Sequence, residues 1–267
     1  MNALDRVVRP SDGSAWITGA SGGIGRATAL RLAADGWTVY ATARRKEPLD
    51  ELAQSASGKG RILALPGDVT DLAAMRAAVK SITSEGPLAL AVLNAGVYTP
   101  MRAESFSAET ARKMFDVNLG GVANALEPVL EHMIARRAGH VAITASVAGY
   151  RGLPDACGYS TTKAGLIAMA EALAMDLADH DVRISVINPG FVETEATAVN
   201  EFEMPFLMSP ETAAERIVAG LKRPGFEIVF PIRFALLLRA VGALPNRAYI
   251  AAMRRMTNWK DRKPRTD

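Results

Sequence analysis

A tyrosine and a lysine four residues apart, Tyr159 and Lys163, could together do acid–base chemistry. They begin a stretch of helical character, and positions four apart lie on one face of a helix, so both side chains can face one cavity. A free tyrosine keeps its proton at neutral pH because its pKa is about 10. Since a nearby ammonium favours the phenolate, we expect Lys163 to lower the pKa of Tyr159 and make it a usable acid or base.

A serine upstream of this pair strengthens the prediction. Ser146 comes just after the apolar run 140–144, and the carboxyl ends of strands in open α/β sheets present ligand-binding groups. Such a serine can hydrogen-bond a substrate oxygen, although turn serines are also common. Tyrosine–lysine pairs also arise by chance on helices. The three side chains together indicate proton transfer at a substrate oxygen.

A glycine-rich turn at residues 18–25 (TGASGGIG) joins the first apolar run to the first helical stretch. We expect Gly19 to allow the sharp turn, Gly23 to let the backbone approach a pyrophosphate, and Gly25 to let the helix pack on the sheet. Glycines also end strands for steric reasons, but this position is that of a dinucleotide-binding loop, where a helix start favours bound phosphate. The predicted contacts are Gly19, Ser21, Gly22, Gly23 and Ile24.

The residues after the second apolar run choose between two nicotinamide cofactors. An NAD site usually places a carboxylate there, whereas this chain has Arg44, Arg45 and Lys46 before its first acid, Glu47. Arginines can bind a 2′-phosphate in a bidentate manner. A solvated charge run opening a helix is the alternative, but basic residues are unfavourable at a helix start. We therefore predict NADP(H) in preference to NAD(H), bound by Arg44 and Arg45.

Alternating apolar runs and helical patterns must position these groups. We predict strands at 14–18, 37–42, 61–65, 88–93, 140–144, 182–187 and 226–230, and helices at 24–34, 71–84, 108–137, 161–179 and 210–221. Ser209, Pro210 and Glu211 have the order of an N-cap, a first-turn proline and a first-turn acid. Repeated β-α-β units predict an α/β fold, a doubly wound seven-stranded parallel sheet with helices on both faces.

Composition restricts the class of protein. The chain has 267 residues, 49% of them hydrophobic and 22% charged, which is typical of one soluble globular domain. We divide it into an N-terminal extension (1–13), a core (14–230) and a helical C-terminal extension (231–267). The lone Cys157 excludes an internal disulfide, and the scattered histidines predict no metal site. Without a visible secretory signal or a long apolar run, we expect a cytoplasmic protein.

In these motifs the chain resembles the short-chain dehydrogenase/reductase family, in its single-domain branch. The resemblance runs in family order from about residue 14 to 194, which is most of the chain. It implies a Rossmann-type sheet and a carbonyl reductase or related oxidoreductase, whose cofactor carries the hydride. The matching motifs are residues 18–25, Asp68-Val69, Asn94-Ala95-Gly96, Asn118, Ser146, Tyr159-xxx-Lys163 and Asn188-Pro189-Gly190.

The resemblance also implies residue roles. Tyr159 would protonate the carbonyl oxygen during reduction, and Ser146 would hold that oxygen. Lys163 would lower the pKa of Tyr159 and bind the nicotinamide ribose, while Asn118 would hold a water in a proton relay. Asn118 could instead be only a helix-bend residue, and Asp68 only a capping acid before Thr70. Further implied cofactor contacts are Asp68 and Val69 at the adenine, Asn94, Ala95 and Gly96 in the cleft, and Pro189, Gly190, Val192 and Thr194 at the nicotinamide end.

By the same resemblance, residues 97–102, 148–158 and 191–208 build the substrate pocket. Their apolar side chains predict an apolar or extended carbonyl compound, and 200–208 could form a mobile lid. Cys157, near the mouth of the site, is interpreted as a packing residue. The predicted lining residues are Val97, Tyr98, Met101, Tyr150, Leu153, Phe202, Met204, Phe206 and Met208.

The net charge of +3 is concentrated at the C-terminus, where residues 251–267 hold six basic and two acidic side chains. A basic tail can be a solvated terminus or can contact lipid, nucleic acid or another subunit; we expect no nucleic-acid partner. The apolar stretch 232–256 could cap the pocket, pack in a homodimer or homotetramer, or lie on a membrane as a basic amphipathic helix. Subunit packing is our first expectation.

Three other functions compete with the oxidoreductase, and one of them, a membrane-associated lipid-modifying reductase, depends only on the C-terminal tail. A non-catalytic dinucleotide-binding sensor or scaffold could use the same fold, but it would not need the set formed by Ser146, Tyr159, Lys163 and Asn118. A sugar-nucleotide epimerase or dehydratase shares the tyrosine–lysine pair, but usually carries a sizeable C-terminal substrate domain. NADPH oxidation against a panel of carbonyl compounds separates the enzyme from the sensor.

Overall fold

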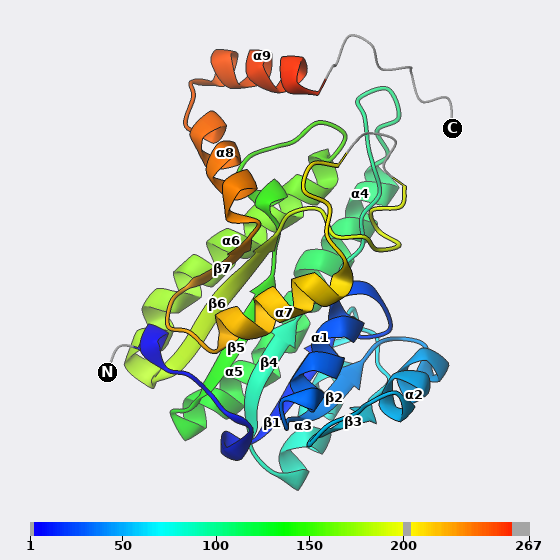
Figure 1. The fold of residues 1–267 in the computed structure, drawn as a ribbon, viewed down its shortest axis with the longest axis vertical. Helices are drawn as coiled ribbons and strands as arrows, with labels where there is room; N and C mark the ends of the chain where they lie inside the picture. The colour runs from blue at the N-terminus through cyan, green and yellow to red at the C-terminus, as the bar shows by residue number, and fades with distance from the viewer. Residues whose placement is uncertain (1–2, 200–203, 258–267) are drawn as a thin grey trace.

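Seven parallel strands form one sheet in the computed structural model, which describes residues 3–199 and 204–257 (Figure 1). The sheet order is β3-β2-β1-β4-β5-β6-β7, so the direction of winding reverses between β1 and β4. The predicted doubly wound α/β fold is therefore confirmed. The strands are β1 (Ser14–Thr18), β2 (Thr38–Thr42), β3 (Arg61–Ala64), β4 (Leu88–Leu93), β5 (Gly139–Thr144), β6 (Val182–Pro189) and β7 (Glu227–Phe230).

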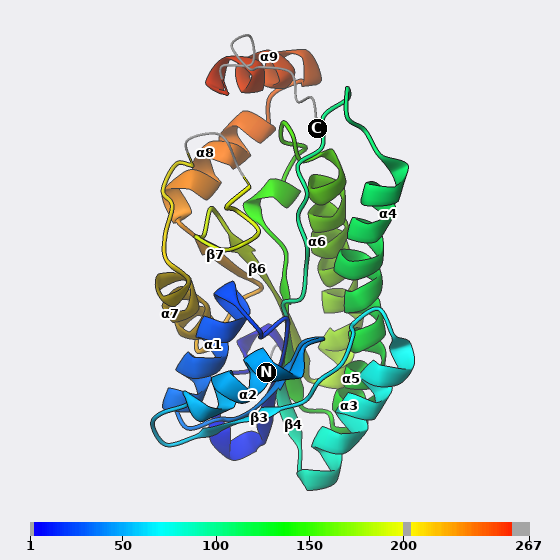
Figure 2. The same cartoon turned by 90° about the vertical axis from the view of Figure 1, so that its right-hand side faces the viewer.

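Helices cover both faces of this sheet (Figure 2). One face carries α1 (Gly23–Ala34), α2 (Lys46–Gln54) and α7 (Pro210–Leu221), and the other carries α3 (Leu72–Glu85), α4 (Ala108–Phe115), α5 (Gly121–Arg136) and α6 (Cys157–Leu177). Every residue of β4, β5 and β6 is buried. Burial on both faces explains why these strands are continuous apolar runs without alternation.

Side-chain caps fix where several helices begin. The Asp71 carboxylate accepts hydrogen bonds from the backbone N–H groups of Ala73 and Ala74, at 2.8 and 3.1 Å, and so starts α3. Ser209 caps α7 in the same way, with Pro210 in its first turn, which confirms the predicted cap. Such caps satisfy N–H groups that have no partner inside the helix.

Three helical predictions differ from the structure. The predicted helix 108–137 is one helical run to Arg136, but its hydrogen-bond pattern changes at a π-helical turn, Asp116–Gly120, between α4 and α5. Helix α6 begins at Cys157, four residues before the predicted start, so Tyr159 lies in its first turn. Helix α2 was not among the predicted helices, although a helix opened by the basic cluster was the alternative to a phosphate site. It is short, and it buries Leu49 and Leu52 against the edge of the sheet.

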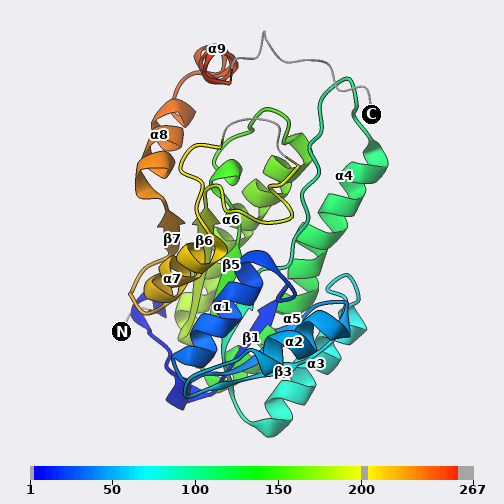
Figure 3. The same ribbon diagram turned by 45° about the vertical axis from the view of Figure 1, so that its right-hand side comes forward.

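The C-terminal part extends beyond the carboxyl edge of the sheet as α8 (Ile232–Gly242) and α9 (Asn246–Met256) (Figure 3). The predicted break near residues 244–246 is confirmed. Helix α8 packs through Phe234, Ala235 and Leu238 against Val147. Within residues 3–199 and 204–257, no helix is long and apolar enough to cross a membrane. Strand β1 begins at Ser14 and β7 ends at Phe230, and the predicted division into core and extensions stays a prediction.

Candidate active site

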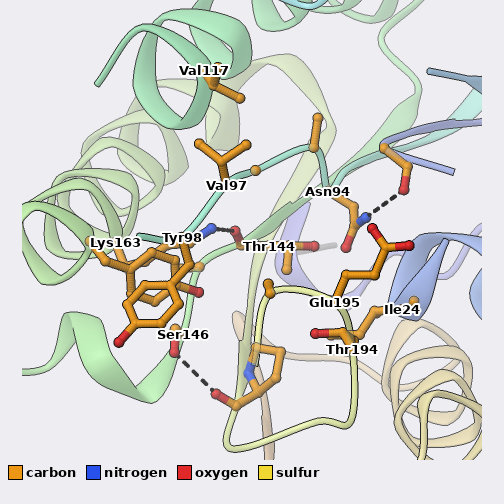
Figure 4. Close-up of a pocket in the computed structure, with 18 of the residues that line it drawn as sticks. Ile24, Asn94, Val97, Tyr98, Val117, Thr144, Ser146, Lys163, Thr194 and Glu195 are labelled. Carbon is orange, nitrogen blue, oxygen red and sulfur yellow. Dashed lines mark hydrogen bonds between the residues drawn. The ribbon is translucent and has the colours of Figure 1, made fainter. Parts of the chain in front are cut away.

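A cleft of about 1250 Å³ lies where the loops after β1, β4, β5 and β6 meet (Figure 4). It contains the predicted catalytic side chains Ser146, Tyr159 and Lys163 at one part and the glycine-rich loop at another. Because parallel strands end at the same edge, the doubly wound sheet brings these distant segments together. Of the predicted site residues, Arg45 and Asn118 do not line this cleft.

The glycine-rich loop is shaped for close approach of its backbone to a ligand. Gly19 and Gly23 have φ angles of 68° and 50°, in the left-handed region that favours glycine. At Gly25 a Cβ atom would lie 2.1 Å from the Gly19 carbonyl oxygen, so only glycine permits this contact between helix and loop. A Cβ on Gly22 would meet nothing within 4 Å.

The start of α1 has no side-chain cap, a feature it shares with α2, α5, α6, α8 and α9, and its first residues line the cleft. The N-cap residue of α1 is Gly22, which has no side chain that could accept hydrogen bonds from the first N–H groups of the helix. Helices α3, α4 and α7 are instead capped by Asp71, Ser107 and Ser209. The first N–H groups of a helix carry partial positive charge, and phosphate oxygens can satisfy them. Loop and helix therefore fit the pyrophosphate of a dinucleotide.

Asn94 fastens the loop to the sheet. Its side-chain amide donates to the carbonyls of Thr18 and Gly19, each at 3.3 Å, and its backbone N–H donates to the Thr18 hydroxyl. The backbone N–H of Ala95 donates to the same hydroxyl. Asn94 lines the cleft, as predicted. Its hydrogen bonds join the end of β1 to the end of β4.

The basic cluster after β2 divides into three different environments. Arg44 is exposed and lines the cleft, whereas Arg45 is the N-cap residue of α2. Lys46 pairs with Asp50 one helical turn later. Within the part of the chain that the structure describes, Arg44 is thus the cation of this cluster that reaches the cleft. The predicted contact of Arg45 with a 2′-phosphate stays a prediction.

Asp68 also lines the cleft, and its pKa is lowered, which favours the carboxylate. Its Oδ1 accepts hydrogen bonds from the backbone N–H and the hydroxyl of Thr70, at 3.0 and 2.8 Å. The backbone bond from Thr70 is the largest cause that lowers the pKa of Asp68, and the positive charge of Arg44 adds to it. Asp68 therefore forms the capping turn considered from the sequence while also lining the cleft.

Helix α6 and the loop after β5 position the catalytic candidates. Ser146 is buried, and its Oγ accepts from the Ala148 N–H at 3.1 Å and donates to the Pro189 carbonyl at 3.3 Å. A Cβ on Gly149 would lie 2.7 Å from the Lys163 carbonyl, so the loop packs directly on the α6 backbone. The Lys163 Nζ donates to the Thr144 carbonyl at 2.8 Å, the end of β5.

The two titrating groups are perturbed by burial. Desolvation raises the pKa of Tyr159 to about 12, although a hydrogen bond with Ser146 lowers it in part. Desolvation also lowers the pKa of Lys163 to about 8, because a buried ammonium loses its hydration. The predicted net lowering of the Tyr159 pKa beside Lys163 was wrong for this geometry, because burial raises this pKa. The ammonium lies 5.4 Å from the ring centroid and donates to Thr144, so burial dominates.

Asn118 lies in the π-helical turn, fully buried, behind the cleft wall. Its side chain accepts from the Val97 N–H at 2.8 Å and donates to the Val97 carbonyl and the Thr162 hydroxyl, at 3.0 and 3.1 Å. These bonds tie the loop after β4 to α6, which agrees with the helix-bend interpretation. Because the side chain is fully engaged, the water relay stays a prediction.

Aromatic and aliphatic side chains surround the Tyr159 end of the cleft. Tyr98 meets the Tyr159 ring edge-on, with ring centroids 5.0 Å apart. Phe191 packs against Phe234 of α8 at 5.7 Å, and both line the cleft. Phe206 contacts Phe234 from the other side, at 6.1 Å. The apolar lining is formed by Val97, Tyr98, Val147, Leu153, Phe191 and Phe234.

Comparison with known proteins identifies the family to which this chain belongs. A family model described as short chain dehydrogenase matches residues 14–203. The chain belongs to the short-chain dehydrogenase family. An uncharacterised oxidoreductase of Myxococcus xanthus is 39% identical over 245 residues, which cover 91% of this chain and 97% of that protein. As a member of this family, the chain is an oxidoreductase.

Solved structures of similar proteins have the same fold. The alcohol dehydrogenase of the archaeon Thermococcus sibiricus, complexed with 5-hydroxy-NADP, is 28% identical, with a TM-score of 0.73 over 82% of this chain and 95% of that one. A short chain dehydrogenase of Burkholderia cenocepacia reaches a TM-score of 0.79 at 24% identity, over 92% and 99% of the two chains, and it supports the fold.

The structure places only some of the predicted pocket residues of this short-chain dehydrogenase in the cleft. Val97, Tyr98 and Leu153 line the cleft, but Met101 is buried beside Met114, and Tyr150 donates instead to Glu227. Phe202 lies outside the described residues. Cys157 is exposed and contacts the Met101 carbonyl. Phe234 was missed, since only tertiary packing shows which face of α8 turns inward.

Proposed function

We propose that this chain is an NADP(H)-dependent oxidoreductase that moves a hydride between a nicotinamide ring and the alcohol or carbonyl carbon of an apolar substrate. One observation carries the proposal. The hydroxyl side chains of Tyr159 and Ser146 line the same cleft as the uncapped start of α1. A proton donor and a phosphate site in one cavity are what a dinucleotide-dependent carbonyl reduction needs.

Particular residues would hold the dinucleotide. The loop from Gly19 to Ile24 would bind the pyrophosphate, and Arg44 would bind the 2′-phosphate by charge-assisted hydrogen bonds. Asp68, with Val69, would flank the adenine, and Pro189, Gly190, Val192 and Thr194 would meet the nicotinamide end. The preference for NADP(H) is supported by the alcohol dehydrogenase of T. sibiricus, which was solved with a derivative of NADP. When bound, the nicotinamide supplies or accepts the hydride.

Ser146 and Tyr159 act on the substrate oxygen. In reduction, the Ser146 hydroxyl donates a hydrogen bond to the carbonyl oxygen and stabilises the negative charge that develops there. With its pKa raised to about 12, Tyr159 keeps its proton at neutral pH. It can therefore give that proton from its hydroxyl oxygen to the new alkoxide, as a general acid must.

Lys163 stabilises the tyrosinate that this transfer leaves behind. Its pKa of about 8 means that it is mostly an ammonium at neutral pH. A positive charge beside a new negative charge in a buried site is strongly favourable. We propose that a water held near Asn118 then returns a proton through Lys163 to Tyr159, which restores the acid for the next turnover.

The apolar end of the cleft indicates the class of substrate. A ketone or aldehyde with a hydrophobic body can bury it against Leu153, Phe191 and Phe234 while its oxygen reaches Ser146 and Tyr159. A small, strongly polar carbonyl compound would leave these side chains uncovered. Sites of this kind fix orientation with a few polar groups and gain affinity from apolar contact.

The test is turnover with a defined panel. Purified protein is mixed with NADPH or NADH and with ketones of increasing apolar length, and nucleotide absorbance and product chirality are followed. We expect single-enantiomer alcohols, higher kcat/KM for apolar ketones, and a preference for NADPH. Tight NADPH binding without turnover of any ketone, or of the alcohols in reverse, would favour the non-catalytic sensor instead.

A further inference from the structure

The outer surface of α8 and α9 exposes large apolar side chains. Leu236 is 55% exposed and Ile250 is 56% exposed, although both are long aliphatic residues. The opposite sides of the same helices are buried, with Phe234 and Leu238 on α8 and Tyr249 on α9. We call the exposed set the C-terminal apolar face, and it comprises Ile232, Leu236, Leu237, Leu244, Ile250 and Met256.

Arginines are frequent in the sequence of these two helices, and acids do not occur in it. On α9, Arg247, Ile250 and Arg254 follow helical spacing and so share one side of the helix. From residue 228 to residue 260 the sequence has five arginines and one lysine but no aspartate or glutamate. In the described part of the chain, Arg239 is the arginine of these two helices that forms an ion pair, with Glu227.

Exposed apolar residues also lie beside the wall of the cleft. Phe206 is 53% exposed, and its ring contacts Phe234, whose own ring lines the cleft. Leu207 beside it is also exposed. Because Phe234 lies on the buried side of α8, Phe206 and Leu207 add exposed apolar side chains next to the inner side of this helix, at the cleft.

The junction of α8 and α9 is held rigidly, so the face is a formed surface. Arg151 donates to the carbonyl oxygens of Gly242 and Leu244 and to the Asn246 side chain. Its guanidinium also lies 4.0 Å from the ring centroid of Tyr249. These contacts anchor both helices to the loop before α6, near the mouth of the cleft.

Charge decides which occupant fits. A second copy joined by a two-fold axis would place the same arginine-rich surface against itself, which is unfavourable without acids to pair them. Nucleic acid would satisfy the arginines but would leave the leucines in water. A bilayer with anionic phospholipids satisfies both, because apolar side chains enter the interface while arginines meet the head groups.

We propose that the C-terminal apolar face docks on bilayers that contain anionic phospholipids. Docking places the apolar end of the cleft at the lipid surface, where carbonyl compounds dissolved in the bilayer could enter past Phe206. Docking itself is independent of the proposed reaction, so a Tyr159→Phe protein should bind vesicles as well as the unaltered chain does.

Flotation of the full chain with vesicles tests this. One set contains phosphatidylcholine alone and the other adds phosphatidylglycerol. We expect the chain to float with the anionic set, and added salt to weaken binding because it screens the arginines. Arg254→Glu with Arg255→Glu should weaken binding about tenfold or more. The matched control, Lys80→Glu with Arg216→Glu, reverses two exposed cations on α3 and α7 and should leave binding unchanged.

A second pair of variants tests the apolar contribution. Leu236→Ser with Leu237→Ser should also reduce binding about tenfold or more, whereas Phe106→Ser with Met175→Ser, which alters exposed apolar residues elsewhere, should not. Absence of binding to anionic vesicles, or equal binding by variants and controls, would overturn the proposal. So would light scattering that shows the leucine variant dissociating an oligomer, since the face would then join two copies of this chain.

Discussion

Replacing Lys163 with methionine should make the protein more stable while removing its activity. Burial lowers the Lys163 pKa from 10.5 to about 8, and one pKa unit corresponds to about 1.4 kcal/mol. The buried ammonium therefore costs about 3 kcal/mol of folding free energy, by that conversion. Methionine keeps the length of the side chain but loses the hydrogen bond to Thr144, worth about 1 kcal/mol. The net gain at neutral pH is about 2 kcal/mol.

The pH dependence of this gain has a definite sign. Below pH 8 the lysine is charged in both the folded and the unfolded chain, so the full cost is present. Between about 8 and 10.5 the folded protein releases its proton first, and the stability of the unaltered chain rises with pH. The advantage of Lys163→Met should therefore shrink across this interval and disappear near its upper end.

Urea unfolding without cofactor, at neutral pH and at about pH 10, measures both quantities. The variant should have the higher midpoint at neutral pH, and the two proteins should converge at high pH. Carbonyl reduction by the variant should be lost. A variant that is less stable than the unaltered chain at neutral pH, or a difference that does not depend on pH, would refute the argument that desolvation sets the pKa of Lys163.

Three further outcomes are expected. Arg44→Ala should weaken NADPH binding by about 10- to 100-fold, the value of one charge-assisted hydrogen bond to a phosphate, and leave NADH binding unchanged. The matched control is Lys46→Ala, which removes a cation of the same cluster that pairs with Asp50 and does not line the cleft; equal losses in fluorescence titration would contradict the assignment. The kcat/KM for reduction should hold at neutral pH and fall as pH rises through about 8, because Lys163 loses its charge; a flat profile to pH 10 would contradict this role. Phe234→Ala should raise KM for apolar ketones about tenfold with little change in kcat, and unchanged steady-state kinetics would remove α8 from the substrate site.

Much of the fold could be predicted because the signals are local. The seven strands are apolar runs ended by glycine or polar residues, and each lies within two residues of its predicted position. Helix α7 was located by its capping sequence at Ser209 and Pro210. The π-helical turn within residues 108–137 could not be predicted in this way. The apolar residues of this stretch repeat with one helical period, whereas the turn at Asn118 is stabilised by hydrogen bonds to Val97 on a different segment.

The sequence predicted which residues form the site better than it predicted their pKa values. The positions of Ser146, Tyr159 and Lys163 in one cleft follow from motif order and sheet topology. The direction of the Tyr159 pKa does not, because spacing along a helix says nothing of how deeply a hydroxyl is buried or of the competing acceptor at Thr144. The place of Phe234 in the cleft likewise depends on how α8 folds back.

The central claim is that the Tyr159 hydroxyl protonates the substrate oxygen beside a bound nucleotide. Its most direct test is Tyr159→Phe, which removes one oxygen and leaves the ring contact with Tyr98 in place. We predict that kcat falls by at least the 10²–10⁴-fold expected for loss of a general acid, while NADPH affinity and the melting temperature stay close to those of the unaltered protein. A variant that binds NADPH and reduces ketones at the original rate would contradict the claim.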